Sequence, residues 1–456
     1  MKIPPLPPPY LEIMRGLSAE RLQKVMSSAL NPAPGGKYHH WDILHHLQPP
    51  GDLTHREWWL AVKFARLQLL KPVPLSDRQG QPFHVGMPDA VFELLHRIDR
   101  DASGHIEISE QVTDPATRDR YLVNSLIEEA ITSSQLEGAA TTHAVAKEML
   151  RSGRRPKDRG ERMILNNFRA MRFLRELRNK KLTPELVLDL HRIVTESTLD
   201  WPDAAGRLKS SQDEPIYVWD QRDGTLLHVP PDVSELPGRL KAMCEFANGL
   251  TPNFFVHPVV RAIVLHFWIG YDHPFIDGNG RTARAIFYWS MLSQGYWLSE
   301  FLSISSILRN APAKYMRAYL YSETDGNDLT YFVLYHLRVI ERAIQELHSY
   351  LRTKMQELRE TKALLRRSAD LNHRQVALLS HALRHPGMQY TIQTHRTTHN
   401  VVHQTARTDL LDLGRRGLLE RQRIGRKYYF MPPEDLLDRL SAGAKGTSRR
   451  GVKGRS

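Results

Sequence analysis

The stretch at residues 273–284, HPFIDGNGRTAR, carries most of the side chains in this chain that could do chemistry. His273 is its only side chain able to accept a proton near neutral pH. The Asp277 carboxylate is a hard oxygen ligand of the kind that Mg²⁺ takes together with waters and phosphate oxygens. Arg281 and Arg284 are three residues apart, so both guanidinium groups lie on one face of a helix and suit phosphate oxygens. The stretch therefore predicts a polyphosphate site with its own base.

Two apolar segments flank this stretch and must position it. Residues 257–270 and 283–294 are rich in apolar helix formers, and the second contains neither proline nor glycine. Gly278 and Gly280 let the backbone take positive φ angles and approach a ligand closely. A helix beginning near Asn279 would add free N–H groups and the positive end of its dipole, which favour an anion. The sequence therefore predicts a loop held between two buried helices.

These residues resemble the Fic family motif, HPFx(D/E)GNGRxxR, at every defined position. The matching residues are His273, Pro274, Phe275, Asp277, Gly278, Asn279, Gly280, Arg281 and Arg284. The resemblance implies transfer of a nucleotide, usually AMP from ATP, to a hydroxyl of a protein Tyr, Ser or Thr. The implied roles are His273 as base, Asp277 as Mg²⁺ ligand, Gly278, Asn279 and Gly280 on the α-phosphate, Arg281 on the phosphate tail and Arg284 on the γ-phosphate. The alternative without chemistry is a glycine-rich turn with capping Asp and Asn side chains.

A helix predicted at residues 120–138 ends in SSQLEG, which resembles the inhibitory motif of the same family, (S/T)xxxE(G/N). The motif residues are Ser133 and Glu137. A Glu137 carboxylate that reached Arg284 would pair with it bidentately and would repel the γ-phosphate from that place. ATP would then bind with its α-phosphate out of line for attack. The pattern therefore predicts an autoinhibited enzyme, and a solvent-facing glutamate is the alternative.

Two β-rich runs around Asp223-Gly224 predict a hairpin. In the Fic family, a hairpin at this place holds the target peptide by main-chain pairing, which reads little sequence. The resemblance assigns this contact to Ile216, Tyr217 and Val218, and a plain surface hairpin is the alternative. Tyr315 falls where the family places groups that contact the base, and core packing is the alternative for that residue.

The chain should be mainly α, a Fic-type helical bundle with a hairpin flap followed by a smaller module. The predicted parts are a mainly helical region at 1–110, a catalytic core at 111–330, a long helix at 331–370, a module at 371–433 and a basic tail at 434–456. The long helix could span to the module or mediate a homodimer, and its heptads are too irregular to insist on a coiled coil.

The module at 371–433 resembles a winged helix-turn-helix, because three helical segments precede a strand, a glycine turn and a second strand. Arg407 lies in the segment that looks like a recognition helix. The wing carries Arg421, Arg423, Arg426 and Lys427. These cations could contact DNA bases and backbone, and a protein is the alternative partner.

Two further patterns suggest metal sites and are better explained otherwise. The histidines within residues 39–46 do not share one helical face, and no carboxylate cluster joins them. We expect them to pack around Trp41. Residues 99–110 fit an EF-hand loop, but Pro115 interrupts the following helix and no second hand is present. A polar turn is the preferred interpretation.

Composition limits the class of protein without choosing its partner. The chain has 456 residues, 41% of them hydrophobic, and a net charge of +13. This charge suits nucleic acid, an anionic surface or phosphorylated ligands. The single cysteine, Cys244, excludes an intrachain disulfide. No apolar run is long enough for a membrane span and residues 1–10 lack a signal core, so we expect a cytoplasmic protein without a membrane partner.

The residues thus favour Mg²⁺-dependent transfer of AMP from ATP to a protein hydroxyl, with Glu137 as inhibitor. Two alternatives remain open. One is a DNA-binding regulator whose Fic-like core senses a nucleotide. The other keeps the enzyme but changes the nucleotide donor, or reverses the reaction and removes AMP.

Overall fold

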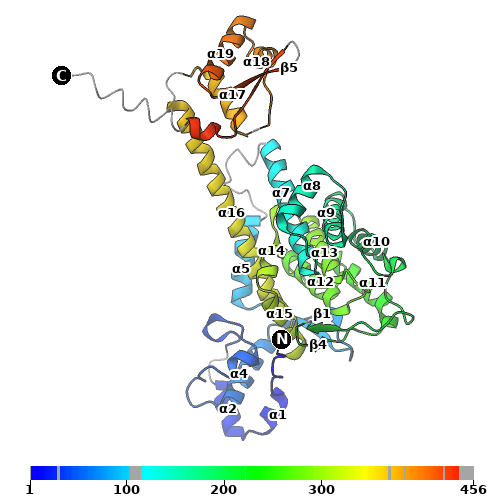
Figure 1. The fold of residues 1–456 in the computed structure, drawn as a ribbon. Helices are drawn as coiled ribbons and strands as arrows, with labels where there is room; N and C mark the ends of the chain where they lie inside the picture. Colours follow the sequence, from blue (N-terminus) through cyan, green and yellow to red (C-terminus); the bar gives the residue numbers. More distant parts are fainter. Residues whose placement is uncertain are drawn as a thin grey trace, which may run out of the picture. The chain divides into compact units, whose positions relative to one another are not determined.

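The computed structural model describes residues 2–27, 31–102, 115–220, 222–367, 371–384, 387–424 and 427–440. The chain divides into two compact units, Met1–Leu347 and His348–Ser456. Both units are mainly helical, as predicted (Figure 1). Residues 103–110 of the EF-hand pattern, Arg426 and residues 441–456 of the basic tail lie outside the described residues.

The first unit begins with short helices and one antiparallel hairpin. These elements are α1 (Tyr10–Arg15), α2 (Ala19–Ser27), η1 (Pro34–Gly36), α3 (Trp41–Leu44), α4 (His55–Leu67), β1 (Leu70–Ser76), β2 (Pro82–Gly86) and α5 (Asp89–Ala102). The capping box at the start of α4 is formed by Thr54 and Glu57, because each side chain accepts the other residue's backbone N–H. The ring of His45 stacks on Trp41 as predicted, whereas the ring of His40 stacks on Tyr321.

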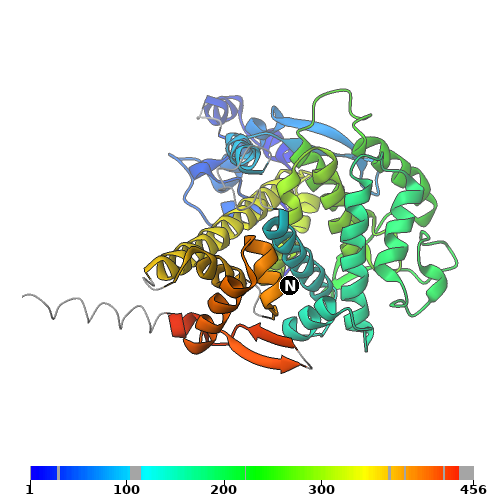
Figure 2. The same cartoon turned by 90° about the horizontal axis from the view of Figure 1, so that it is seen from above.

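The rest of the first unit is a helical bundle that carries the motif loop (Figures 1 and 2). Its helices are α7 (Pro115–Leu136), α8 (His143–Ser152), α9 (Arg159–Leu177), α10 (Pro184–Thr195), η2 (Pro202–Ala204), η3 (Val233–Glu235), α11 (Leu236–Ala247), α12 (Pro258–Asp272), α13 (Asn279–Ser293), η4 (Trp297–Phe301), α14 (Ile304–Asn310), α15 (Pro312–Thr324) and α16 (Thr330–Arg367). Helix α16 crosses the boundary between the two units. No helix within the described ranges is both long enough and apolar enough to span a bilayer.

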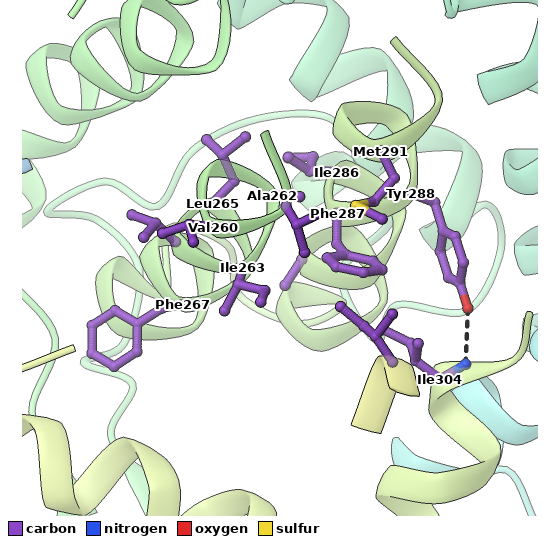
Figure 3. Close-up of a cluster of buried hydrophobic side chains, with 14 of the residues drawn as sticks. Val260, Ala262, Ile263, Leu265, Phe267, Ile286, Phe287, Tyr288, Met291 and Ile304 are labelled. Carbon is purple, nitrogen blue, oxygen red and sulfur yellow. Dashed lines mark hydrogen bonds between the residues drawn. The ribbon is translucent and has the colours of Figure 1, made fainter. Parts of the chain in front are cut away.

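Helices α12 and α13 form the centre of the bundle and are buried on nearly all sides, as their apolar sequences predict. Figure 3 shows side chains from both helices in one buried hydrophobic cluster, among them Ile263 and Phe287. Each fully buried side chain of this size contributes about 1.5–3 kcal/mol to folding. The backbone N–H of Ile304 donates to the Tyr288 hydroxyl at 3.0 Å, which ties α14 to α13 (Figure 3). This packing holds the loop between α12 and α13 at both ends.

The predicted hairpin is present as β3 (Val218–Asp220) and β4 (Thr225–His228), paired antiparallel. Gly224 has φ +67° and its N–H donates to the Asp220 carbonyl at 2.8 Å, closing the turn. Ile216 and Tyr217 precede the first strand, which begins at Val218.

The second unit follows the predicted order of three helices and a hairpin. Its elements are α17 (His373–Arg384), α18 (Ile392–His399), α19 (His403–Arg415), β5 (Glu420–Ile424) and β6 (Lys427–Met431). This unit has a separate hydrophobic core, whose fully buried residues include Leu379, Leu410, Leu413 and Phe430. Tyr390 pairs with Phe430 as an isolated antiparallel bridge beside the hairpin.

Candidate active site

The motif loop runs from the C-terminal end of α12 to the N-terminal end of α13. His273 directly follows α12 and takes a left-handed conformation, with φ 44° and ψ 53°. Non-glycine residues rarely adopt this conformation, so the turn is specified by its surroundings. Gly278 precedes α13 with φ +84°, and α13 begins at Asn279 as predicted. The loop thus runs from His273 at the end of α12 to the N-terminus of α13.

His273 is half-buried and its imidazole is a weak base in this conformation. Burial, and secondarily the Lys209 and His228 charges, lower the pKa of His273 to about 3. Burial also lowers the pKa of Lys209 to about 8. The backbone N–H of Lys209 donates to the Pro274 carbonyl at 2.9 Å, so this lysine belongs to the loop's surroundings. At neutral pH the imidazole is therefore uncharged and able to accept a proton.

The Asn279 side chain closes the loop on itself. Its Oδ1 accepts the N–H of Phe275 at 3.0 Å, and its Nδ2 donates to the carbonyl of the same residue at 2.8 Å. Phe275 is fully buried in the hydrophobic core and anchors the loop there. Because the amide is used at both ends, contact with a phosphate is left to the backbone N–H groups of residues 278–280.

The two motif arginines are both buried but differ in their partners. Arg281 donates from Nη1 to the Val194 carbonyl at 2.6 Å. Its Nε and Nη2 are buried and have no hydrogen-bond partner within the part of the chain that the structure describes. The closest charge to Nη2 is Oδ1 of Asp277 at 3.6 Å, beyond hydrogen-bond reach. Buried donors left open in this way suit an anionic ligand.

Arg284 reaches Glu137 as predicted, with Nη2 at 2.8 Å from Oε1. The expected bidentate pairing is wrong, because Glu137 accepts from Nη2 alone and Nε is directed to Ser133. Arg284 donates from Nε to the Ser133 hydroxyl at 2.8 Å and from Nη2 to the Ser133 carbonyl at 2.9 Å. The predicted inhibitory residues and the arginine predicted to bind the γ-phosphate therefore form one cluster.

The Glu137 carboxylate also covers the first turn of α13. A Cβ atom added at Gly280 would overlap the Glu137 carboxylate oxygen. The carboxylate thus lies where the helix N-terminus attracts an anion. Only glycine at position 280 leaves room for it.

Asp277 is the candidate metal ligand, and its carboxylate is 39% exposed. Arg159 Nη2 approaches Oδ2 at 3.5 Å and Arg281 Nη2 approaches Oδ1 at 3.6 Å. Both contacts are long, and Oδ1 also accepts the Gly278 N–H at 2.5 Å, so Oδ2 is the oxygen left open to a hard cation. Over the described ranges, no three His, Cys, Asp or Glu side chains gather to hold a metal by themselves. The donor set therefore fits Mg²⁺ that arrives with a nucleotide and keeps phosphate and water ligands.

The C-terminal end of α10 packs against the loop, a contact that the sequence did not indicate. Val194 accepts from Arg281, and a Cβ atom at Gly278 would lie 2.6 Å from the methyl carbon of Thr195. His191, which the spacing of α10 marks as a core histidine, is indeed fully buried. Its contacts with the loop cross 86 residues of sequence, a separation at which helical periodicity carries no signal.

The hairpin is anchored next to the loop and presents aromatic side chains. His228 Nε2 lies 2.7 Å from the carbonyl oxygen of Tyr271, two residues before His273. Tyr217 and Trp219 are 42% and 50% exposed, and their rings meet edge to face at 6.3 Å. Ile216 and Val218 are half-buried.

Tyr315 is buried, and its hydroxyl lies 2.7 Å from Nε2 of His266 in the core. A contact between Tyr315 and a nucleotide base stays a prediction.

Comparison with known proteins agrees with this geometry. Residues 181–291 match the family model described as the Fic/DOC family. The chain is 26% identical over 209 residues to the protein adenylyltransferase Fic of Nematostella vectensis, covering 45% of each chain. It is 28% identical over 211 residues to that of Aedes aegypti, covering 45% of this chain and 38% of the relative. The chain thus spans less than half the length of these curated relatives.

The fold is similar to that of a solved structure. A crystal structure of a Fic family protein from Desulfovibrio desulfuricans G20 superposes with a TM-score of 0.52 at 19% identity, covering 76% of this chain and 97% of that chain. The complete motif and its position between two buried helices agree with these matches. Residues 181–291 therefore match the Fic/DOC family by sequence, and the motif loop lies within that match.

Proposed function

We propose that this protein transfers AMP from ATP to a hydroxyl side chain of a protein. The observation that carries the proposal is the motif loop, which joins a neutral His273, open Arg281 donors and the N-terminus of α13 in one place. The activity in the names of the relatives, protein adenylyltransferase, supports the same reaction.

In the proposed reaction, His273 takes the proton of the target hydroxyl as its oxygen attacks the α-phosphorus. A bond forms between that oxygen and phosphorus, the bond to the bridging oxygen breaks, and pyrophosphate leaves. The N–H groups of residues 278–280 stabilise the charge on the α-phosphate, and the open donors of Arg281 bind the phosphate tail. Asp277 would hold Mg²⁺, which supplies charge neutralisation at the phosphates when it is bound.

We propose that the structure corresponds to the inhibited form of this enzyme. Arg284 and the first turn of α13 are the groups that a γ-phosphate would use, and the Glu137 carboxylate contacts both. A phosphate in this place would have to displace a carboxylate of like charge. Movement of the C-terminal end of α7 would therefore precede transfer.

The hairpin is the proposed contact for the protein target. Its strand β3 begins at Val218, and the exposed rings of Tyr217 and Trp219 lie on the same segment. Strand pairing would hold the target backbone, and the aromatic side chains would favour apolar residues near the modified hydroxyl.

The second unit supports a separate candidate function, binding of DNA. Arg407 on α19 is exposed, and so are Arg421 and Arg423 on β5. Tyr428 lies under the guanidinium of Arg421 at 4.9 Å. Gel shifts with random duplexes at increasing salt would test this function, since phosphate contacts predict a steep loss of affinity. An Arg407→Ala protein that bound as tightly as the parent would remove α19 from the interface.

Labelling with α-³²P-ATP tests the proposed transfer. We expect the Glu137→Gly protein to label itself or a protein in a lysate, and the added His273→Ala substitution to abolish labelling while ATP still binds. Mass spectrometry would identify the adduct and its acceptor. Parallel reactions with other labelled nucleotides distinguish AMP transfer from another donor, and no labelling with any nucleotide would contradict the proposal.

A further inference from the structure

His191 on α10 contacts the motif loop at Phe275 and Asp277, and its second ring nitrogen contacts Gly206. Its ring stacks on Phe275, with centroids 3.8 Å apart and planes inclined by 5°. Its Nε2 lies 2.9 Å from the carbonyl oxygen of Asp277. Its Nδ1 lies 3.0 Å from the backbone nitrogen of Gly206. No part of this side chain is exposed to solvent.

These partners define one tautomer of the ring. A carbonyl oxygen only accepts, so Nε2 of His191 carries the hydrogen and donates to Asp277. The Gly206 N–H only donates, so Nδ1 carries the lone pair. Both ring nitrogens are satisfied, and both hydrogen bonds lead to backbone around the proposed active site.

The contacts of His191 restrict the loop backbone at Asp277 and Gly278, next to the proposed metal and phosphate sites. Because the Asp277 carbonyl is held, the peptide plane that carries the Gly278 N–H is held with it. The stack on Phe275 holds the loop from its buried side. Gly206 begins the segment that reaches Lys209, whose N–H donates to the Pro274 carbonyl at 2.9 Å. His191 therefore joins this segment and the loop through a single ring.

We propose that His191 is a positioning residue for AMP transfer, which sets the direction of the Asp277 carboxylate and of the Gly278 N–H. This inference rests on the proposed function of the loop. Outer hydrogen-bond partners of a metal ligand typically change metal affinity or activity by about 10–100-fold when they are replaced. His191 acts here through the backbone of the ligand residue, so its loss should raise the metal requirement and lower the turnover together.

Three substitutions separate the contacts of His191. His191→Phe keeps an aromatic ring on Phe275 and removes both hydrogen bonds. His191→Gln places an amide donor near the position of Nε2, so the bond to Asp277 can form again. His191→Asn ends near the position of Nδ1 and leaves Asp277 without that donor. Gln and Asn both lose the stack and can keep opposite hydrogen bonds, so a lower Mg²⁺ requirement in Gln than in Asn reports the bond to Asp277.

The chain offers a matched control in His40, another fully buried histidine. Its ring stacks on Tyr321 at 4.3 Å and 11°, Nδ1 accepts the Asp42 N–H at 3.1 Å, and Nε2 lies 3.2 Å from the Thr324 hydroxyl. None of these partners belongs to the motif loop. His40→Phe therefore keeps an aromatic ring and removes an equivalent pair of hydrogen bonds elsewhere in the same unit.

The experiment uses the full chain with Glu137→Gly as the parent. Turnover, the KM for ATP and the Mg²⁺ concentration for half-maximal rate are measured, and calorimetry gives ATP affinity with Mg²⁺ and with EDTA. For His191→Phe we expect turnover to fall by about 10–100-fold and the Mg²⁺ requirement to rise by about tenfold. ATP affinity in EDTA should stay within about twofold of the parent. His191→Gln should require less Mg²⁺ than His191→Asn.

Two results would overturn the positioning role. One is a loss in His191→Phe no larger than in His40→Phe at equal melting temperature. The other is an equal Mg²⁺ requirement in His191→Gln and His191→Asn, a comparison that holds even where the Phe variant does not fold. A parent without any AMP transfer would instead contradict the proposed function. In that case, the Mg²⁺ dependence of ATP affinity in the same variants still decides the role of His191.

Discussion

The guanidinium of Arg284 donates from Nη2 to Oε1 of Glu137 at 2.8 Å. This hydrogen bond joins helix α13 to the residue that follows α7. The arginine side chain is 2% exposed and the glutamate side chain 25% exposed. A hydrogen bond between charged groups with this burial contributes about 1.5–3 kcal/mol. The contact is therefore strong enough to bias the site between two states, and weak enough for a ligand to reverse it.

Removing the negative charge of Glu137 should activate the enzyme. In Glu137→Gln, Arg284 is released for the γ-phosphate, and we expect the rate of AMP transfer to rise about ten- to hundredfold, matching about 1.5–3 kcal/mol. Initial rates with labelled ATP measure this. Glu128→Gln is the control, because Glu128 lies on the same helix and pairs with His143 away from the loop. Equal rates in the two variants would reject the inhibitory role.

Ser133 should contribute to the same restraint, since its hydroxyl accepts from Arg284 Nε at 2.8 Å. We expect Ser133→Ala to raise the basal rate by a few fold, less than Glu137→Gln, because a neutral acceptor is lost and the carboxylate remains. Ser134→Ala is the matched control. The Ser134 hydroxyl is buried and has no hydrogen-bond partner among the residues that the structure describes. A basal rate that rises as much in Ser134→Ala as in Ser133→Ala would contradict this assignment.

Gly280 and Glu137 should be coupled in stability. A methyl group at residue 280 would overlap the Glu137 carboxylate, so Gly280→Ala has to displace that side chain. We expect Gly280→Ala to lower the melting temperature in the wild-type background and to lower it less in the Glu137→Gly background. Thermal melts of the wild type, the two single variants and the double variant give the coupling between the two residues directly. Additive changes would mean that the carboxylate does not lie on the first turn of α13 in solution.

Acid should destabilise the protein partly through Glu161 at the start of α9. Arg154 donates two hydrogen bonds to its carboxylate at 2.7 Å each, and this pairing lowers the pKa of Glu161 to about 2 from an ordinary 4.5. The folded state thus binds this proton less readily than the unfolded state, so the stabilisation is present above about pH 4.5 and is lost toward pH 2. We expect Glu161→Gln to melt below the wild type at pH 7 and the difference to shrink on acidification. A difference independent of pH would show that the charge of Glu161 does not contribute.

Several local features follow from short-range rules that one sequence contains. Thr54 and Glu57 are three residues apart and form a capping box whatever the rest of the chain does. Gly224 follows Asp223 between two β-rich runs and closes a hairpin for the same reason. The dense motif at 273–284 likewise identifies its own base, carboxylate and arginines, because their types and spacing are specific.

The sequence by itself therefore determined the helical character, the two buried helices around the motif, and the identity of the pair Arg284 and Glu137. Only the tertiary structure decided how that pair meets. It shows a single carboxylate contact from Nη2, with Nε donating to the Ser133 hydroxyl, because the pairing depends on the angle at which α7 packs on α13. It also brought His191 to Phe275 and Asp277 across more than eighty residues, because side-chain contacts between distant segments are set by packing of whole helices rather than by any local pattern.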